Sequence, residues 1–159
     1  MREELDKQLC EKFPKIFAQR TGDMCETCMC WGFSCGDGWY PILEALCWNI
    51  QSHIKNRLLT IKFAEKWNAN VADPDFEWPD YWAERKKRTV PEPVSQVVAT
   101  QVKEKFGTLR FYFSGGDDVI DGMVSMAESM SSRMCEVCSA PAIVAQEGGY
   151  IRTVCKEHQ

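Results

Sequence analysis

The sequence contains no long hydrophobic run, almost no histidine and no recognisable catalytic motif. No segment approaches the roughly 18 consecutive apolar residues of a membrane-spanning helix, so we expect no membrane span. Residues 1–7 are mostly charged and include no apolar stretch, so we expect no secretory signal peptide. Only two histidines occur, and there is no Ser/His/Asp set, phosphate-binding loop or metal-plus-Glu motif. The sequence therefore predicts a protein that is not an enzyme.

A net positive charge is also missing. Lysine and arginine total 19 against 23 aspartates and glutamates, which gives a formal net charge of −4. Nucleic-acid-binding proteins usually carry a basic surface, so nucleic acid is the less expected partner. Cysteine, in contrast, is abundant, with nine residues. We expect a cytoplasmic protein, and in that compartment thiols stay reduced and clustered cysteines more often bind metal than form disulfides.

A four-residue repeat of apolar side chains predicts a long central helix. Its members are Ile42, Leu46, Ile50, Ile54 and Leu58, and the neighbours Leu43, Cys47 and Trp48 widen the same face. Asp37 is the expected N-cap, Pro41 lies in the first turn, and the helix can extend to Trp67. We expect its apolar face to form the core. His53 lies on the polar flank and is assigned no role.

The hydrophobic period changes to two over residues 94–113, which predicts an antiparallel strand pair. Leu109, Phe111 and Phe113 fall on one face, and Thr108, Arg110 and Tyr112 on the other. Two hypotheses remain open for the polar face, namely a surface for a small anionic ligand and an ordinary solvated side of a sheet. The residues of the first hypothesis are Lys103, Lys105, Arg110 and Tyr112. Next, Asp117 or Asp118 is expected to cap a helix that leads to Cys135.

The most specific motif lies at the end of the sequence. Cys135 and Cys138 form one pair, and Cys155 and His158 form a second pair after an insert of sixteen residues. Two short Cys/His pairs separated in this way are typical of a tetrahedral zinc site. Four protein ligands leave no open position, so we expect a structural zinc ion rather than a catalytic one.

The insert between the two pairs predicts a β-hairpin. Residues 142–145 and 150–154 have strand composition, and the Gly148-Gly149 pair lies in the turn between them. A hairpin brings its ends together, and the two ligand pairs would meet there. The overall prediction is an α+β fold with a long central helix, a short antiparallel sheet and a C-terminal zinc-ribbon-like hairpin. Its main domain spans residues 1–133, and the ribbon module, packed on it, spans residues 134–159.

Two other segments carry weaker hypotheses. Cysteines recur four times within eleven residues, at Cys25, Cys28, Cys30 and Cys35. They are candidates for a second metal site, but no second pair comes from a separate segment, so buried or free thiols on a loop are favoured. A basic run at residues 85–88 beside Tyr81 and Trp82 is a candidate for contacting phosphates or bases, with solvated surface as the favoured alternative.

Three blocks of the sequence resemble a family of small, largely uncharacterised proteins encoded by tailed phages and prophages. The blocks are residues 28–33 with 36–40, residues 102–112 with 115–118, and the terminal Cys135, Cys138 and Cys155. The resemblance covers most of the chain except residues 60–95. It implies a phage accessory protein in the cytoplasm of an infected host cell, rather than a virion component or a replication enzyme. It transfers no functional residue beyond the metal ligands.

The resulting functional hypothesis is a non-enzymatic accessory protein that binds and blocks or sequesters a host or defence factor. The partner would be a protein or a small anionic signalling molecule. The alternative is a nucleic-acid-binding zinc-ribbon protein. In the ribbon module two cations, Arg152 and Lys156, oppose three anions, Glu136, Glu147 and Glu157, which leaves about −1. Because phosphate contacts need cations, this module alone is a poor nucleic-acid surface.

Overall fold

The computed structural model describes residues 1–79, 84–147 and 149–159, and these residues form an α+β fold, as predicted. The helices are α1 (Glu3–Lys12), α2 (Tyr40–Ala72) and α3 (Asp118–Ser131), with short 3₁₀ turns η1 (Ala18–Thr21), η2 (Cys28–Trp31) and η3 (Asp37–Trp39). The strands are β1 (Phe33–Ser34), β2 (Ser95–Lys105), β3 (Thr108–Gly116), β4 (Ile143–Glu147) and β5 (Tyr150–Val154). None of the helices described is long and apolar enough to cross a bilayer.

Helix α2 is the longest element, with 33 residues that span about 50 Å. Pro41 lies in its first turn, as predicted, but the prediction of Asp37 as the N-cap is wrong. Asp37 instead begins the preceding η3 turn, and its carboxylate forms an ion pair with Arg2 at 2.5 Å. The η3 turn places Trp39 at the N-cap of α2, so Asp37 lies before the cap and does not cap the helix.

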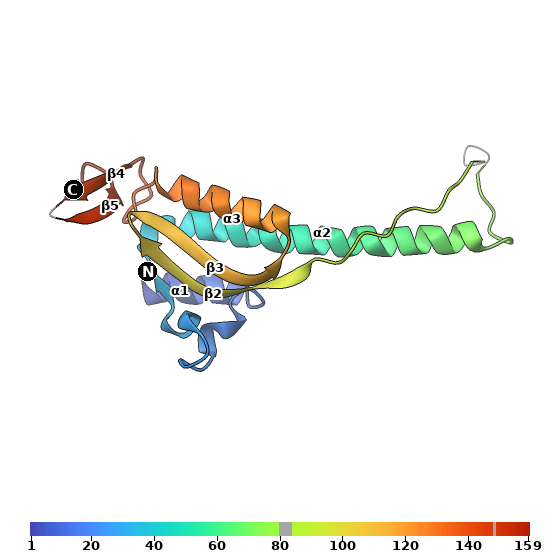
Figure 1. Cartoon of the computed structure of the whole chain (residues 1–159), viewed down its shortest axis with the longest axis horizontal. Helices are drawn as coiled ribbons and strands as arrows, with labels where there is room; N and C mark the ends of the chain where they lie inside the picture. Colours follow the sequence, from blue (N-terminus) through green and yellow to red (C-terminus); the bar gives the residue numbers. More distant parts are fainter. Residues whose placement is uncertain (80–83, 148) are drawn as a thin grey trace.

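Only the first half of α2 is buried in the core. The repeat is buried as far as Ile54, but Leu58 is 45% exposed and Trp48 67% exposed, so their predicted burial is wrong. Beyond Ile54 the helix projects from the body, as Figure 1 shows. We call this projection, with residues 84–93 that run back along it, the arm. Tyr81 and Trp82 lie outside the described residues, so the arm is defined without them.

The main sheet contains the predicted hairpin and one additional strand. Strands β2 and β3 pair antiparallel, as predicted, and β1 adds to β2 in parallel, which gives the order β1-β2-β3. Val102 opposite Phe111 points into the core, and both are buried. The tight turn between the strands contains Phe106 and Gly107, both with positive φ, at 55° and 75°. This conformation suits a two-residue hairpin turn.

Helix α3 covers the free edge of β3. The Ser131 hydroxyl accepts a hydrogen bond from the backbone N–H of Leu109 at 2.8 Å, and a Glu128 carboxylate oxygen accepts one from Phe111 at 2.9 Å. An edge strand with unpaired N–H groups invites pairing with other chains, and these contacts prevent it here. At the start of α3, Asp117 is the N-cap and accepts from the backbone N–H of Ile120.

Candidate metal centre

The two predicted ligand pairs meet at the open end of the C-terminal hairpin. Strands β4 and β5 pair antiparallel over their whole length, which brings the chain before β4 next to the chain after β5. Cys135 and Cys138 lie in the turn that follows α3, while Cys155 directly follows β5 and His158 closes the next turn. The four potential ligand atoms all lie within 4.8 Å of one another. This cluster can hold a metal ion.

Two distances between the donor atoms match those of a tetrahedral site. The Cys138 and Cys155 sulfurs are 3.7 Å apart, and the Cys135 sulfur is 3.8 Å from Nδ1 of His158. Bonds of about 2.3 Å to sulfur and about 2.1 Å to nitrogen require tetrahedral edges of about 3.6–3.8 Å. The Cys155–His158 edge is shorter, at 3.1 Å. Two of these three edges therefore match tetrahedral coordination, and the Cys155–His158 edge is about 0.5 Å too short.

The environment of the cluster favours a thiolate at Cys135. This cysteine is fully buried, and burial alone raises the pKa of a thiol. Backbone N–H groups that include those of Cys155 and Cys138 donate to its sulfur and outweigh burial, so the pKa of Cys135 is lowered to about 6. At Cys138 the backbone N–H of Ala140 lowers the pKa, but desolvation and the hydrogen bonds with the Cys135 and Cys155 sulfurs outweigh it and raise the pKa. A bound cation would favour the thiolate at Cys138, because metal ligation requires deprotonated thiols.

A loop more than ninety residues earlier in the chain supports the first ligand pair. We call residues 36–39 the GDGW loop. The backbone N–H of Gly38 donates to the Glu136 carbonyl at 2.7 Å, and the Ser139 hydroxyl donates to the Gly38 carbonyl at 2.8 Å. A methyl group on Gly38 would overlap the Cys135 carbonyl oxygen and lie 2.8 Å from the Cys138 nitrogen. Only glycine allows this approach.

The same loop makes two further bonds to the ligand turn. The backbone N–H of Gly36 donates to a Glu136 carboxylate oxygen at 2.9 Å, and the Trp39 indole N–H donates to the Met134 carbonyl at 2.9 Å. Trp39 is fully buried in the main core. Sequence reasoning interpreted this loop as the start of a helix and missed its role. The signal present was two glycines flanking an aspartate, directly before a tryptophan.

The hairpin also contacts the turn between β2 and β3. The buried Thr153 hydroxyl donates to the Gly107 carbonyl, while the Thr153 carbonyl accepts from the backbone N–H of Glu136 at 2.9 Å. Gly107 itself packs against Ile151 and Val144. The Cys/His cluster is thus hydrogen-bonded to the main body on two sides. Gly148 of the predicted turn lies outside the described residues.

The four cysteines of the N-terminal segment do not come together. Cys25 and Cys28 are exposed, the Cys30 thiol donates to the Thr27 carbonyl at 3.0 Å, and Cys35 is buried, which raises its pKa to about 12. Among the residues described, only the C-terminal group has metal-binding spacing.

The predicted anion surface is present on one face of the sheet, but its charges are partly used. Lys103 lies opposite Arg110 in the β2–β3 register and 5.3 Å from the centre of the Tyr112 ring. Arg110 pairs with Glu128 at 3.6 Å. Lys105 packs over Phe106 at the turn. The four residues do not enclose a common site.

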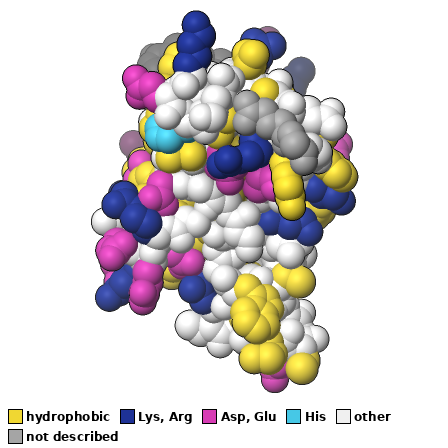
Figure 2. All heavy atoms as spheres, turned by 90° about the vertical axis from the view of Figure 1, so that its left-hand side faces the viewer, with side chains coloured by type: hydrophobic (Ala, Val, Ile, Leu, Met, Phe, Trp, Pro, Cys, Tyr) yellow, Lys and Arg dark blue, Asp and Glu magenta, His cyan; other side chains and the backbone are white. Residues whose placement is uncertain are grey.

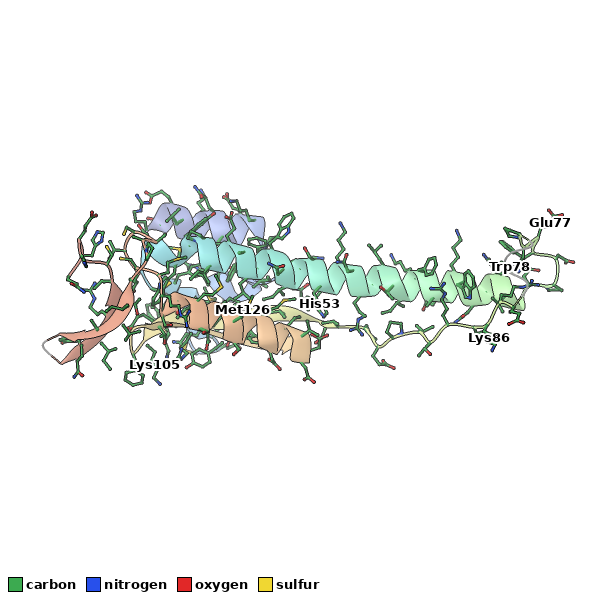
Figure 3. The ribbon with its side chains drawn as sticks, turned by 90° about the horizontal axis from the view of Figure 1, so that it is seen from above. His53, Glu77, Trp78, Lys86, Lys105 and Met126 are labelled. Atoms are coloured by element: carbon green, nitrogen blue, oxygen red, sulfur yellow. The ribbon has the colours of Figure 1, made fainter. Side chains whose placement is uncertain are left out.

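The basic run at residues 85–88 lies in the arm. The guanidinium of Arg88 stacks 4.6 Å from the Trp67 ring centre, and that of Arg85 stacks 5.1 Å from the Trp78 ring centre. The Trp67 indole N–H donates to the Lys86 carbonyl at 2.9 Å. Arg88 and the Lys86 carbonyl therefore help to hold the returning chain on the helix (Figure 3).

Comparison with protein-family models, with curated proteins and with solved structures finds no match. Functional inference therefore rests on the residues of this chain.

Proposed function

We propose that Cys135, Cys138, Cys155 and His158 hold a structural zinc ion. The observation that carries this proposal is that three sulfurs and one nitrogen lie within 4.8 Å of one another, with two of their distances at tetrahedral spacing. Thiolate and imidazole donors suit zinc, and four protein ligands leave no position for water or substrate. The ion would secure the end of the chain to the GDGW loop, because zinc-binding free energy acts as folding free energy.

The ribbon module is a poor surface for nucleic acid. The formal charges of the ribbon module sum to a negative value. Figure 2, which views the molecule from the left-hand side of Figure 1, shows lysines and arginines intermixed with aspartates and glutamates. Affinity for nucleic acid comes mainly from an excess of cations. The zinc ion would therefore stabilise the fold, and the surface that binds a partner would lie outside the ribbon module.

We further propose that the protein is a non-enzymatic accessory protein that binds and blocks a host or defence protein. The observation behind this proposal is an apolar groove of about 270 Å³ between α2 and α3, which we call the methionine groove. Its lining includes Ile42, Leu46, Met123, Met126 and Met130. Met126 is 61% exposed and Met130 48% exposed. Figure 3 shows Met126 on the helix beside α2.

The chemistry of this groove favours a protein over a small anion as the partner. Among the residues that the structure describes, no charged side chain lines it. Methionine side chains are flexible and polarisable, and they adapt to the apolar side chains of a partner protein. The resemblance to phage accessory proteins, given above, makes a host or defence protein the expected class of partner.

The methionine groove can be tested by affinity capture from host cells. The wild-type chain is compared with a Met126→Lys/Met130→Lys double variant and with Met24→Lys, a control at a methionine that is 66% exposed elsewhere. The proposal expects a protein that wild type and the control capture and the double variant does not. Identical captured proteins for all three would contradict the groove as the binding surface.

A further inference from the structure

One face of α2, bordered by the end of α1 and the start of β2, is hollowed over much of its length. Three adjoining hollows of about 590, 300 and 560 Å³ follow the helix from Pro41 to Lys62. The first two share Trp48, and the second and third share Gln51 and Lys55. We call this continuous depression the lysine groove. It lies on the side of α2 that faces α1, whereas the methionine groove lies toward α3 (Figure 3).

The lysine groove is strongly cationic, although the chain as a whole is acidic. In the part of the chain that the structure describes, four lysines line it, Lys12, Lys15, Lys55 and Lys62, and Glu44 is its one acidic residue. Glu44 pairs with Lys12 at 2.5 Å. Within residues 1–79, 84–147 and 149–159, no ion pair involves the other three lysines. The groove therefore has three unpaired positive charges.

An exposed aromatic ring lies among these charges. Trp48 is 67% exposed, although its position in the apolar repeat predicts burial. Trp48, Lys55 and Lys62 are spaced by seven residues, which places them on one face of the helix at intervals of about 10.5 Å. The hydration of a large exposed indole is unfavourable, and a planar partner would cover it.

An unsatisfied polar group lies where the second and third hollows join. The side-chain amide nitrogen of Gln51 is buried and has no hydrogen-bond partner among the described residues. A buried donor without a partner is unfavourable, so a ligand that offers an acceptor would be favoured there. Cations, an exposed indole and an unused donor thus occur along a single groove.

We infer that the lysine groove binds single-stranded nucleic acid. Lys15, Lys55 and Lys62 would contact phosphates, and the ring of Trp48 would stack on a base. Every base has a planar face, so such stacking requires an unpaired strand but no particular sequence. From Pro41 to Lys62 the helix rises about 32 Å, which accommodates a strand within the usual range of roughly 4–16 nucleotides for a small site.

Duplex nucleic acid and acidic peptide fit the groove less well. In a duplex the bases are stacked within the helix, so none is free to cover Trp48. The carboxylates of an acidic peptide would meet the lysines but provide no planar group for the indole. The inference also explains how an acidic chain with an acidic ribbon can bind nucleic acid, because the cations are gathered along one groove rather than on the ribbon module.

The test is fluorescence anisotropy with labelled 12-nucleotide single strands of DNA and RNA at low salt. We expect Trp48→Ala and Lys55→Glu/Lys62→Glu each to weaken binding at least tenfold. With three phosphates contacted, log K should fall against log salt with a slope of about −2. The matched control is Lys103→Glu/Lys105→Glu, which changes the net charge equally on the outer face of the sheet and should alter binding by less than threefold.

Melting temperatures of all variants establish that they are folded. Trp48, Lys55 and Lys62 lie on the surface, so these variants should melt as wild type does. The inference is overturned if neither strand binds at 50 mM salt, or if the control pair weakens binding as much as the groove pair. It is also overturned if a duplex binds as tightly as the single strand, or if a polyglutamate peptide displaces the strand at equal charge concentration.

Discussion

The two cysteine-rich segments differ both in their density of thiols and in their structure, and the segment with the lower density is the one that gathers its thiols. The N-terminal segment has four cysteines within eleven consecutive residues, and its thiols point to different surroundings. The C-terminal group takes three cysteines and a histidine from two separate turns, and its donor atoms lie within 4.8 Å. A hairpin and two supporting loops position the second group. The difference shows that coordination depends on segments brought together, and not on the local density of cysteine.

A different set of interactions holds the N-terminal segment. The guanidinium of Arg20 pairs with the buried Asp6 at 2.9 Å and donates to the Cys30 carbonyl at 2.9 Å. Thr27 caps the η2 turn by accepting from the backbone N–H of Met29. An ion pair and a helix cap therefore stabilise the N-terminal segment, whereas we assign that role to a metal ion at the C-terminal end.

The largest expected effect comes from removing one exposed cysteine from each segment. Cys138→Ser should lose the metal and lower the free energy of unfolding by more than about 3 kcal/mol, because metal binding contributes to folding. Cys28→Ser should cost less than about 0.5 kcal/mol, because its thiol is exposed. Thermal denaturation of both variants measures the difference. Equal losses would remove the distinction between the two segments.

The GDGW loop provides the next test. Gly38→Ala should destabilise the protein by about 3 kcal/mol and weaken metal binding, because the new methyl group overlaps the Cys135 carbonyl. Gly122→Ala is the control, since a methyl group there meets nothing within 4 Å in the middle of α3. It should raise stability by up to about 1 kcal/mol. Urea denaturation measures the stability of both variants, and metal titration measures their affinity for metal. If Gly38→Ala changes neither, the loop does not support the site.

The arginine of the N-terminal segment tests the other half of the comparison. Arg20→Ala leaves the carboxylate of Asp6, which is 9% exposed, without its partner. We expect a loss of about 2 kcal/mol, discounted because the arginine itself is partly exposed. A chelator should not change this loss. If chelation and Arg20→Ala expose the same cysteines to alkylation, the two segments do not behave independently.

The smallest effect concerns a helix cap that needs no metal. The hydrogen bond from His53 and the bond from the backbone N–H of Ile120 lower the pKa of Asp117. Asp117→Ala should cost about 1 kcal/mol, and Asp118→Ala much less. A carboxyl group whose pKa is lower in the folded state stabilises the fold at any pH above its pKa in the unfolded chain, about 3.9. This stabilisation is lost as the pH falls through the lower pKa of the folded state. Acid unfolding of the Asp117→Ala and Asp118→Ala variants measures this contribution. Equal midpoint pH values for the two variants would contradict Asp117 as the cap.

Sequence reasoning succeeded where the determining contacts are local. The periodicity of residues 94–113, the spacing of the two ligand pairs and the strands of the terminal hairpin all depend on near neighbours, and all are present. It was wrong for Trp48 and Leu58, because a repeat defines a helix face but not the element that covers it. It missed the GDGW loop, since the contact of Gly38 with Glu136 joins residues nearly a hundred positions apart.

The metal content of the wild-type chain tests the central claim most directly. Protein purified under reducing conditions is analysed by native mass spectrometry and elemental analysis, with Cys138→Ser and Cys28→Ser measured alongside. We predict one zinc ion per chain in wild type and in Cys28→Ser, and none in Cys138→Ser. No zinc in the wild-type chain would contradict a metal centre at Cys135, Cys138, Cys155 and His158, and two ions would show that the N-terminal cysteines bind metal as well.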